Sequence, residues 1–481
     1  MRRLSWLPVV VLLTLAAPSA ADEPVTLPDT PAGKRAGEFI AAFNGGDLDA
    51  LKKFHTSSTA PDQAANRAER DRQFGRDHGK FQLLAVPKAT DQEVTLLART
   101  DLTEAVFEVA LRFEKESPHR LTGLGIRPGK APAVKRAKPL TDEELVRALD
   151  ELVRKLAAAD RFSGAVLLVK GDAPLYRKAV GLASVSFQAP NRIDTKFNLG
   201  SMNKMLTAVA VAQLAQRGKL SFDDTLASVV PDYPNKEVAG KVTIHQLLTH
   251  TSGMGSYFND KYQQASKTRF RAVKDYLPLF ADDPLQFQPG ERFGYSNAGF
   301  HVLGLVVEKV SGQDYFDYVR EHIYRPAGMT DSDSYDLEVD TPNLAIGYTT
   351  QGLGGPSSGP RRNNLFMHVV KGGPAGGGFS TVEDLAKFAA ALRGHKLLDA
   401  KHTDLVLEGK VPAFGPDTKY GYGFMERVEG GKRVVGHGGG FPGISGQLDI
   451  YRDQGYVLAV LSNYDGGATP IANRSAELLR E

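Results

Sequence analysis

The chain has 481 residues, which predicts about two to three domains, and its content of 42% hydrophobic and 24% charged residues is typical of globular proteins. The absence of cysteine excludes disulfide bonds, thiolate zinc sites and cysteine nucleophiles. The formal net charge is +3 and would be +1 without Arg2 and Arg3, which argues against a nucleic-acid-binding or membrane-surface protein.

The first residues predict a secretory signal peptide over residues 1–21. Arg2 and Arg3 precede an apolar run over residues 7–17, and small residues then form a cleavage site that we place after Ala21. The run is too short for a membrane-spanning helix and no later run is long enough, so the mature chain is expected to have no transmembrane segment. These features predict a periplasmic or secreted protein.

Residues 27–126 are expected to form a first, smaller domain. Apolar residues recur at helical spacing through Phe39 and Phe43 until Asn-Gly-Gly at 44–46 ends the helix. A second short helix and a charged helical stretch follow. Strand-like runs then cover residues 81–86, 93–100, 104–113 and 119–126. Helices followed by consecutive antiparallel strands are typical of an α+β domain.

The opening of this domain, EFIAAFNGGDLDALKKFH, resembles the nuclear-transport-factor-2-like family. The resemblance implies a cone-like fold that can hold a ligand or bind a partner. His55 and His78 stand alone in the sequence, which favours surface positions over catalytic ones. We therefore expect this domain to bind a ligand or partner rather than to catalyse a reaction.

A linker is predicted over residues 127–140. The stretch RPGKAPAVKRAKPL has three prolines and five basic residues with few large apolar ones. Because no aromatic residue is interleaved with the basic ones, the composition favours a solvated spacer over a nucleic-acid-binding patch.

Residues 141–481 are expected to form the larger, α/β domain. Thr141 and Glu144 form a capping box at the start of an amphipathic helix, and a hairpin follows over residues 164–180. The middle of the domain is mainly helical, and strand patterns return at 421–427, 432–436, 446–451 and 455–462 before a last helix over 471–479. This order predicts one antiparallel sheet that is built from both ends of the domain and flanked by helices, with a helical subdomain inserted.

A possible nucleophile stands where the insertion begins. Ser201 opens an apolar helix and Lys204 follows three positions later, so the two side chains share one helix face. A serine hydroxyl needs a base to accept its proton, and a lysine with a lowered pKa can be that base. This is the only Ser-x-x-Lys in the chain. The alternative is a helix N-terminus followed by an ordinary solvated lysine.

An ordered set of motifs favours the catalytic interpretation. Residues 141–481 resemble the serine β-lactamase and penicillin-binding-protein superfamily, in its class C-like and esterase branch. The resemblance is carried by FNLGSMNKMLTAVAVAQLAQRGKLSFDDTL, VTIHQLLTHTSGM, PGERFGYSNAGFHVLG, YRPAGMTDSDS, GGGFSTVEDLAKF and GHGGGFPGISG, in the order of the family. It implies an acyl-enzyme on Ser201.

The second motif of the family is Tyr-x-Asn, and Tyr295 with Asn297 occupies it in the PGERFGYSN context. Tyr233 and Tyr257 also begin Tyr-x-Asn triplets, but the first lies in a proline-rich turn and the second is assigned to a surface loop. By resemblance, Lys204 and Tyr295 exchange the proton of Ser201, and either one could be the general base. Asn297 is expected to contact Lys204 and the substrate.

The third motif is usually Lys-Thr-Gly, and this chain has His437-Gly438-Gly439 in its place. The change resembles esterases and D-amino-acid peptidases, and it removes a cation and a hydroxyl that bind the carboxylate of a β-lactam. His437 could donate a hydrogen bond and, when protonated, bind a carboxylate; the alternative is a structural histidine. By resemblance, the backbone N–H groups of Ser201 and Gly440 form the oxyanion hole, each worth about 3 kcal/mol.

The remaining histidines are assigned structural roles. His245 and His250 lie in or near the HTSG marker, whose family role is packing. No pair of histidines has a zinc-like context, so neither a metal nor another cofactor is expected. The Gly-x-Ser-x-Gly pattern occurs only in the glycine- and proline-rich stretch GGPSSGP, which does not fit the strand-to-helix elbow of an α/β-hydrolase.

The sequence therefore predicts a serine hydrolase acting on small esters or on peptides and amides that contain D-amino acids. One alternative within the enzymes is a β-lactamase or a D-alanyl carboxypeptidase. The non-enzyme alternative is a ligand-binding or sensor protein with a slow or silent site. The intact Ser201, Lys204 and Tyr295 argue against silence.

Overall fold

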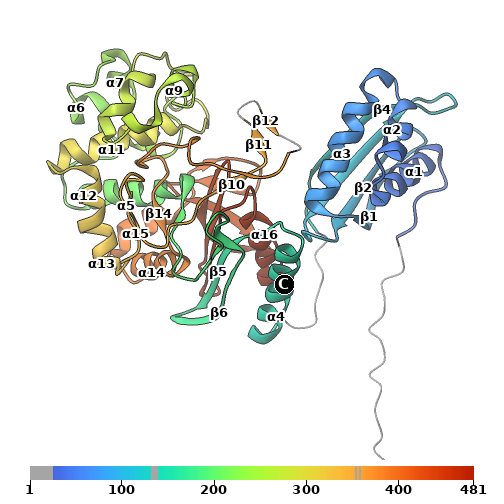
Figure 1. Cartoon of the computed structure of the whole chain (residues 1–481). Helices are drawn as coiled ribbons and strands as arrows, with labels where there is room; N and C mark the ends of the chain where they lie inside the picture. The colour runs from blue at the N-terminus through green and yellow to red at the C-terminus, as the bar shows by residue number, and fades with distance from the viewer. Residues whose placement is uncertain (1–24, 132–138, 353–354, 357–358, 481) are drawn as a thin grey trace, which may run out of the picture. The chain divides into compact units, whose positions relative to one another are not determined.

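The computed structural model describes residues 25–131, 139–352, 355–356 and 359–480, and the chain divides into two compact units (Figure 1). The first unit extends to Ala131 without Leu102–Ala105, and the second contains those four residues and the rest of the chain. The predicted signal peptide (1–21) and residues 132–138 of the predicted linker lie outside the described residues.

The first unit is an α+β fold in which helices precede a four-stranded antiparallel sheet of order β1-β2-β3-β4. Helix α1 packs against β1, β2 and β3, and the amide of Asn44 ties its end to Phe81 through two hydrogen bonds of 2.8 and 2.9 Å. The elements are α1 (Pro31–Gly45), α2 (Leu48–Thr56), α3 (Ala64–His78), β1 (Phe81–Ala89), β2 (Glu93–Thr100), β3 (Val106–Phe113) and β4 (Leu121–Pro128).

The surface position expected for His55 is wrong. Its side chain is fully buried, and its Nε2 lies 2.6 Å from a carboxylate oxygen of Asp71 on α3. His78 is partly buried and packs against the rings of Phe74 and Phe107 at 4.4 and 4.9 Å. Lone histidines in sequence can acquire partners from another helix, and this long-range pairing left no local signal.

The second unit is built on an eight-stranded antiparallel sheet of order β15-β16-β17-β18-β19-β20-β5-β6. Strand β5 comes from the start of the unit and pairs with β20 near its end, from Gly164–Ser462 to Lys170–Tyr456. The fold class predicted for this domain is therefore confirmed. The strands of this sheet are β5 (Gly164–Lys170), β6 (Ala173–Val180), β15 (Val411–Pro412), β16 (Thr418–Tyr420), β17 (Met425–Glu429), β18 (Lys432–Phe441), β19 (Ile444–Tyr451) and β20 (Tyr456–Ser462).

Helices cover both faces of this sheet. Successive strand residues point to opposite faces, so neighbouring residues of one strand pack against different helices. On β5, Val166 and Leu168 pack toward α4 and α16, which lie side by side in Figure 1. Ala165 and Leu167 face the larger core around α5. The helices of the unit are α4 (Asp142–Ala158), α5 (Asn203–Gln216), α6 (Leu226–Val229), α7 (Lys236–Lys241), α8 (Ile244–Leu248), α9 (Asp260–Gln264), α10 (Leu277–Phe280), α11 (Asn297–Ser311), α12 (Tyr315–Val319), α13 (Arg325–Ala327), α14 (Val382–Arg393), α15 (Ala400–Leu407) and α16 (Ala468–Arg480).

Short strands connect the inserted helices to the sheet domain. Strand β9 ends just before Ser201 and pairs with β14, which follows the glycine-rich segment 372–378. The pairing brings two distant parts of the chain together at the start of α5. These strands are β7 (Leu182–Ser184), β8 (Ala189–Pro190), β9 (Phe197–Asn198), β10 (Tyr348–Thr349), β11 (Gln351–Gly352), β12 (Gly355–Pro356), β13 (Arg362–Asn363) and β14 (Phe379–Ser380).

Several of the expected strands have different bounds, and two of the differences bear on the site. Residues 421–427 are not one strand, because the Gly421 N–H donates to the Phe424 carbonyl over 2.8 Å and Gly423 has φ of 73°, which makes a turn between β16 and β17. The strand expected over 432–436 continues through the glycine run to Phe441. The glycines of the third motif therefore lie within a strand.

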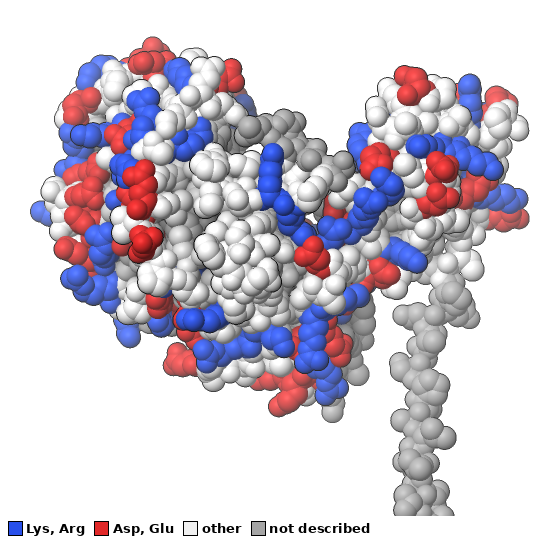
Figure 2. All heavy atoms as spheres, in the orientation of Figure 1, with Lys and Arg blue, Asp and Glu red and all other residues white. Residues whose placement is uncertain are grey.

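The surface carries both signs of charge. Figure 2 shows acidic and basic side chains interspersed over the visible face of each unit, as expected for a chain of small net charge. Among the residues that the structure describes, none of the helices combines the length and apolar content needed to cross a membrane.

Candidate active site

Ser201 lies in a tight turn between β9 and α5. The turn is a 3₁₀ turn over Gly200–Met202, and Gly200 has φ of 50°, in the left-handed region that favours glycine. A Cβ at Gly200 would lie 2.9 Å from the Gly440 nitrogen of β18, so only glycine fits between these backbones. The Asn198 side chain accepts a hydrogen bond of 2.9 Å from the Gly200 N–H and fixes the turn.

Lys204 is the second residue of α5 and is fully buried. Its Nζ is 3.2 Å from Ser201 Oγ, and it donates hydrogen bonds of 2.8 Å to Asn297 Oδ1 and 2.6 Å to the Ala375 carbonyl. Those two partners are oxygens that only accept, so they take two of the amine's N–H groups. In a neutral amine the remaining lone pair is free to accept the proton of Ser201.

Burial lowers the pKa of Lys204 well below its ordinary value. Two ring contacts favour the charged form, since the Nζ lies 4.9 Å from the centre of the Tyr295 ring and 5.7 Å from that of Phe300. Such a cation–π contact is worth about 0.5–2 kcal/mol, whereas removing an ammonium from water costs several kcal/mol. Burial therefore shifts Lys204 toward the neutral amine, which is the form able to act as a base.

Tyr295 stands beside the nucleophile, just before α11. Burial raises the pKa of its phenol, and a hydrogen bond to Ser201 opposes that rise. A neutral phenol can both accept and donate a proton, which suits it to carry a proton between groups.

His250 supports this tyrosine through the backbone. Its Nδ1 accepts a hydrogen bond of 3.0 Å from the Ser296 N–H, and its ring lies 4.3 Å from that of Tyr295. The residue is buried and burial lowers the pKa of its imidazole, so it packs as a neutral ring. These contacts agree with the structural role that the sequence suggested for it.

Asn297 is the first residue of α11 and lines the cavity beside Ser201. Its Oδ1 accepts from Lys204, and its Nδ2 donates to Ser256 Oγ over 3.3 Å. The contact with Lys204 is the one expected from the sequence. The longer bond to Ser256 leaves the amide N–H groups close to the cavity.

The segment around Ala375 was missed by the sequence analysis as part of the site. Polar side chains of α5 bind the backbone of this segment. Thr207 donates to the Pro374 carbonyl over 2.7 Å, and Asn203 accepts from the Gly378 N–H over 3.1 Å. Lys204 binds the carbonyl between them. The only signal was the density of glycine at 372–378, because these contacts use backbone atoms that no side-chain pattern reveals.

His437 lies on β18 and is buried, with both ring nitrogens engaged. Its Nε2 lies 3.0 Å from the Tyr420 hydroxyl, and its Nδ1 lies 2.5 Å from the Gly438 carbonyl. Burial and the nearby Lys204 lower the pKa of His437 to about 3. A protonated His437 that binds a carboxylate does not fit this geometry, and the structural alternative is the better description.

The three glycines that follow His437 differ in the space around them. A Cβ at Gly439 would lie 1.9 Å from the Leu199 carbonyl oxygen, and one at Gly438 would meet the Gln447 side chain at 2.8 Å. A Cβ at Gly440 would meet nothing within 4 Å, because this residue lines the cavity. β18 thus passes against the Ser201 turn, as the expected oxyanion hole of Ser201 and Gly440 requires.

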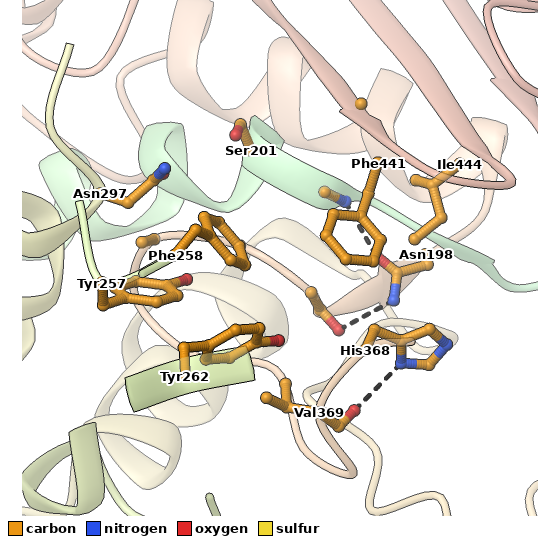
Figure 3. A pocket seen from close by; sticks show the side chains of 15 residues that line it. Asn198, Ser201, Tyr257, Phe258, Tyr262, Asn297, His368, Val369, Phe441 and Ile444 are labelled. Carbon is orange, nitrogen blue, oxygen red and sulfur yellow. Dashed lines mark hydrogen bonds between the residues drawn. The ribbon is translucent and has the colours of Figure 1, made fainter. Parts of the chain in front are cut away.

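A cavity of about 60 Å³ opens beside Ser201, and Figure 3 shows the side chains around it. Tyr257 lines this cavity and is buried, so its expected position in a surface loop is wrong. Tyr233, the third Tyr-x-Asn tyrosine, is also buried but does not line the cavity, consistent with a structural role. None of the described residues lining the cavity is a lysine or arginine.

A metal site is also not evident within the described ranges, where no group of three histidine, aspartate or glutamate side chains is arranged to hold an ion. His245 is partly buried, and its Nδ1 lies 2.8 Å from the Tyr422 hydroxyl, outside the group around Ser201. The site therefore consists of Ser201 with a buried amine, a phenol, an amide and the backbone of two glycine-rich segments.

Comparisons with known proteins agree with this geometry. A family model described as Beta-lactamase matches residues 149–480. The chain is similar to a penicillin-binding protein from Bacillus halodurans (32% identity, 69% of this chain and 98% of that one, TM-score 0.60). It is similar to Esterase EstB from Burkholderia gladioli (28% identity, 68% and 82%) and to a D-stereospecific amidohydrolase from a Streptomyces species (26% identity, 68% and 98%, TM-score 0.58). The chain therefore belongs to the Beta-lactamase family of serine hydrolases.

Proposed function

We propose that this protein is a secreted or periplasmic hydrolase that forms an acyl-enzyme on Ser201 with small esters or with amides and peptides that contain D-amino acids. The observation that carries the proposal is the environment of Lys204. This buried amine gives two N–H groups to Asn297 and Ala375 and keeps its third position, 3.2 Å away, for Ser201.

The proton path follows from these contacts. Ser201 Oγ attacks the carbonyl carbon as its proton passes to the neutral Lys204, and the new oxyanion is stabilised by the backbone N–H groups of Ser201 and Gly440. The proton then passes through the Tyr295 phenol to the leaving group as the bond to carbon breaks. Water reverses the sequence and releases the acid. Lys204 is the base in this proposal, because burial disfavours both its ammonium form and the phenolate of Tyr295.

The substrate class is supported by two kinds of observation. Among the relatives, one is named an esterase and another a D-stereospecific amidohydrolase. In the site, burial lowers the pKa of His437 and both of its ring nitrogens are hydrogen-bonded. The lining of the cavity beside Ser201 has no lysine or arginine that would bind a carboxylate. We therefore place esters and D-amides ahead of β-lactams and carboxyl-terminal D-alanine peptides, and expect slow or no hydrolysis of a chromogenic cephalosporin.

The test is the Ser201→Ala variant with 4-nitrophenyl acetate as substrate. Loss of the nucleophile should lower kcat by more than about 10⁴-fold, while Ser186→Ala, at an exposed position of the same unit, should leave kcat unchanged. Mass spectrometry of the wild-type protein with the ester, a D-amino-acid amide and a cephalosporin should place an acyl group on the peptide that contains Ser201. Undiminished turnover by Ser201→Ala would refute the assignment, and absence of any turnover would favour the silent binding protein.

The proposed export has its own test. When the full chain is expressed with its first residues, the exported protein should begin at Asp22, which intact-mass measurement reports. An unprocessed mass in the cytoplasmic fraction would contradict the proposed location.

A further inference from the structure

A second, larger cavity lies next to the one beside Ser201. It has a volume of about 800 Å³ and shares Phe258, Tyr262, His368 and Phe441 with the inner cavity. The shared rings pack on one another: Phe258 and Phe441 are stacked with centroids 5.8 Å apart, and Tyr262 stands edge-on to Phe258 at 5.0 Å. Figure 3 shows these rings, with Tyr257, gathered around the hollow at whose edge Ser201 lies.

The outer cavity is largely apolar and reaches the surface through exposed hydrophobic side chains. Leu365, Phe366 and Met367 line it, and Phe366 is 93% exposed. An exposed phenylalanine beside an apolar hollow is typical of a binding surface. The charged side chains at its rim are already engaged: Lys267 donates to the Ala265 carbonyl over 3.0 Å, and Glu338 pairs with Arg271. The lining thus holds one lysine and one glutamate, and this balance gives no net charge that would select a charged ligand.

The position of the leaving group decides which part of the substrate these cavities take. The leaving group must receive a proton as it departs, so it lies on the side of Tyr295. That phenol does not line either cavity, and its ring is near Phe414 and Tyr420 at 6.1 and 6.5 Å. The inner cavity is lined by Ser201 but not by Tyr295, and on this ground we assign both cavities to the acyl part.

From this arrangement we propose that the acyl part of the substrate is a long, unbranched apolar chain that runs from Ser201 past Phe258 and Phe441 into the outer cavity. The inference rests on the acyl-enzyme proposed above. The small inner cavity admits a narrow chain, and the larger outer cavity accommodates its end against Phe366. The substrate class is thus a medium-chain acyl ester or amide.

The experiment is a series of 4-nitrophenyl esters from acetate to octanoate, in which the leaving group is constant. Each buried methylene is expected to raise kcat/KM by up to about fourfold, and the octanoate-to-acetate ratio should be at least about 100-fold. Phe366→Ser should lower this ratio by about tenfold, whereas the matched control Phe187→Ser, at a position 84% exposed, should leave it unchanged.

The outcomes separate the two proposals. A flat or falling series with turnover that depends on Ser201 overturns the acyl-chain inference and leaves the hydrolase intact. If neither an ester nor a D-amino-acid amide is hydrolysed, the proposed function fails. Whenever no ester is hydrolysed, calorimetric titration of Ser201→Ala with octanoate and acetate decides: selective binding of octanoate supports the inference and equal or absent binding overturns it. A Phe366→Ser variant that changes the oligomeric state but not the ratio shows a contact between copies of the chain, and also overturns it.

Discussion

Lys204 on α5 and His437 on β18 are two buried basic side chains near Ser201, and burial lowers the pKa of both. Their hydrogen bonds differ. Lys204 keeps one position for Ser201 Oγ, whereas both nitrogens of His437 are engaged by Tyr420 and Gly438. Burial favours the neutral form of both groups. Their hydrogen-bond partners determine which of the two can accept the proton of Ser201.

The largest expected effect is on Lys204. An arginine at this position stays protonated and cannot accept a proton, so Lys204→Arg should lower kcat/KM for 4-nitrophenyl acetate by about 10³-fold or more. His437→Gln keeps a polar side chain and should stay within about tenfold of the wild type, because His437 takes no proton in the proposed path. The reverse order of effects would show that the histidine is the base.

Tyr295 should come next in size. Tyr295→Phe keeps the ring that packs on His250 but removes the hydroxyl, and kcat should fall by about 10²-fold. Tyr420→Phe is the matched control, since it removes a buried hydroxyl from the same cluster of rings without touching Ser201. Equal losses in the two variants would mean that the hydroxyl of Tyr295 acts through packing alone.

The smallest effect concerns stability and pH. Burial lowers the pKa of His437 to about 3 in the folded protein, whereas the unfolded chain has the ordinary value of about 6.5. Between these values the unfolded chain holds the extra proton, so the free energy of unfolding should fall as the pH falls, by at most about 1.4 kcal/mol per pH unit for this group. In urea titrations His437→Gln should show a shallower decline below pH 6.5 than the wild type, and the two should run parallel above pH 7.5. Equal slopes below pH 6.5 would contradict a neutral, buried His437.

The parts of the site that lie close together in sequence were predictable, and those that depend on distant contacts were not. Ser201 and Lys204 are three residues apart across a 3₁₀ turn and the start of α5, so their proximity was expected from helical spacing. The partner of His437 is Tyr420, on another strand, and the oxygen that binds Lys204 belongs to the backbone of Ala375. Neither contact has a local signature, which is why the histidine was expected to bind substrate.

The fold shows the same difference between features set by local sequence patterns and features set by long-range contacts. The alternating and apolar runs of β5, β19 and β20 predicted the sheet, because burial of one or both faces restricts side-chain type. The break at Gly423 was not predicted, since a single glycine within a strand pattern is compatible with continuation or with a turn. The burial of His55 against Asp71 depends on how α2 and α3 pack, and hydrophobic spacing does not encode it.

The glycines of β18 have a consequence for engineering. The Leu199 carbonyl bars any larger residue at position 439, but the neighbouring position, Gly440, points into open space at the mouth of the inner cavity. A randomised library at 440 would therefore add side chains beside the reacting carbonyl while the strand pairing with Ser445 stays in place. Position 439 therefore tolerates only glycine, whereas substitutions at position 440 are expected to change the substrate preference of this enzyme.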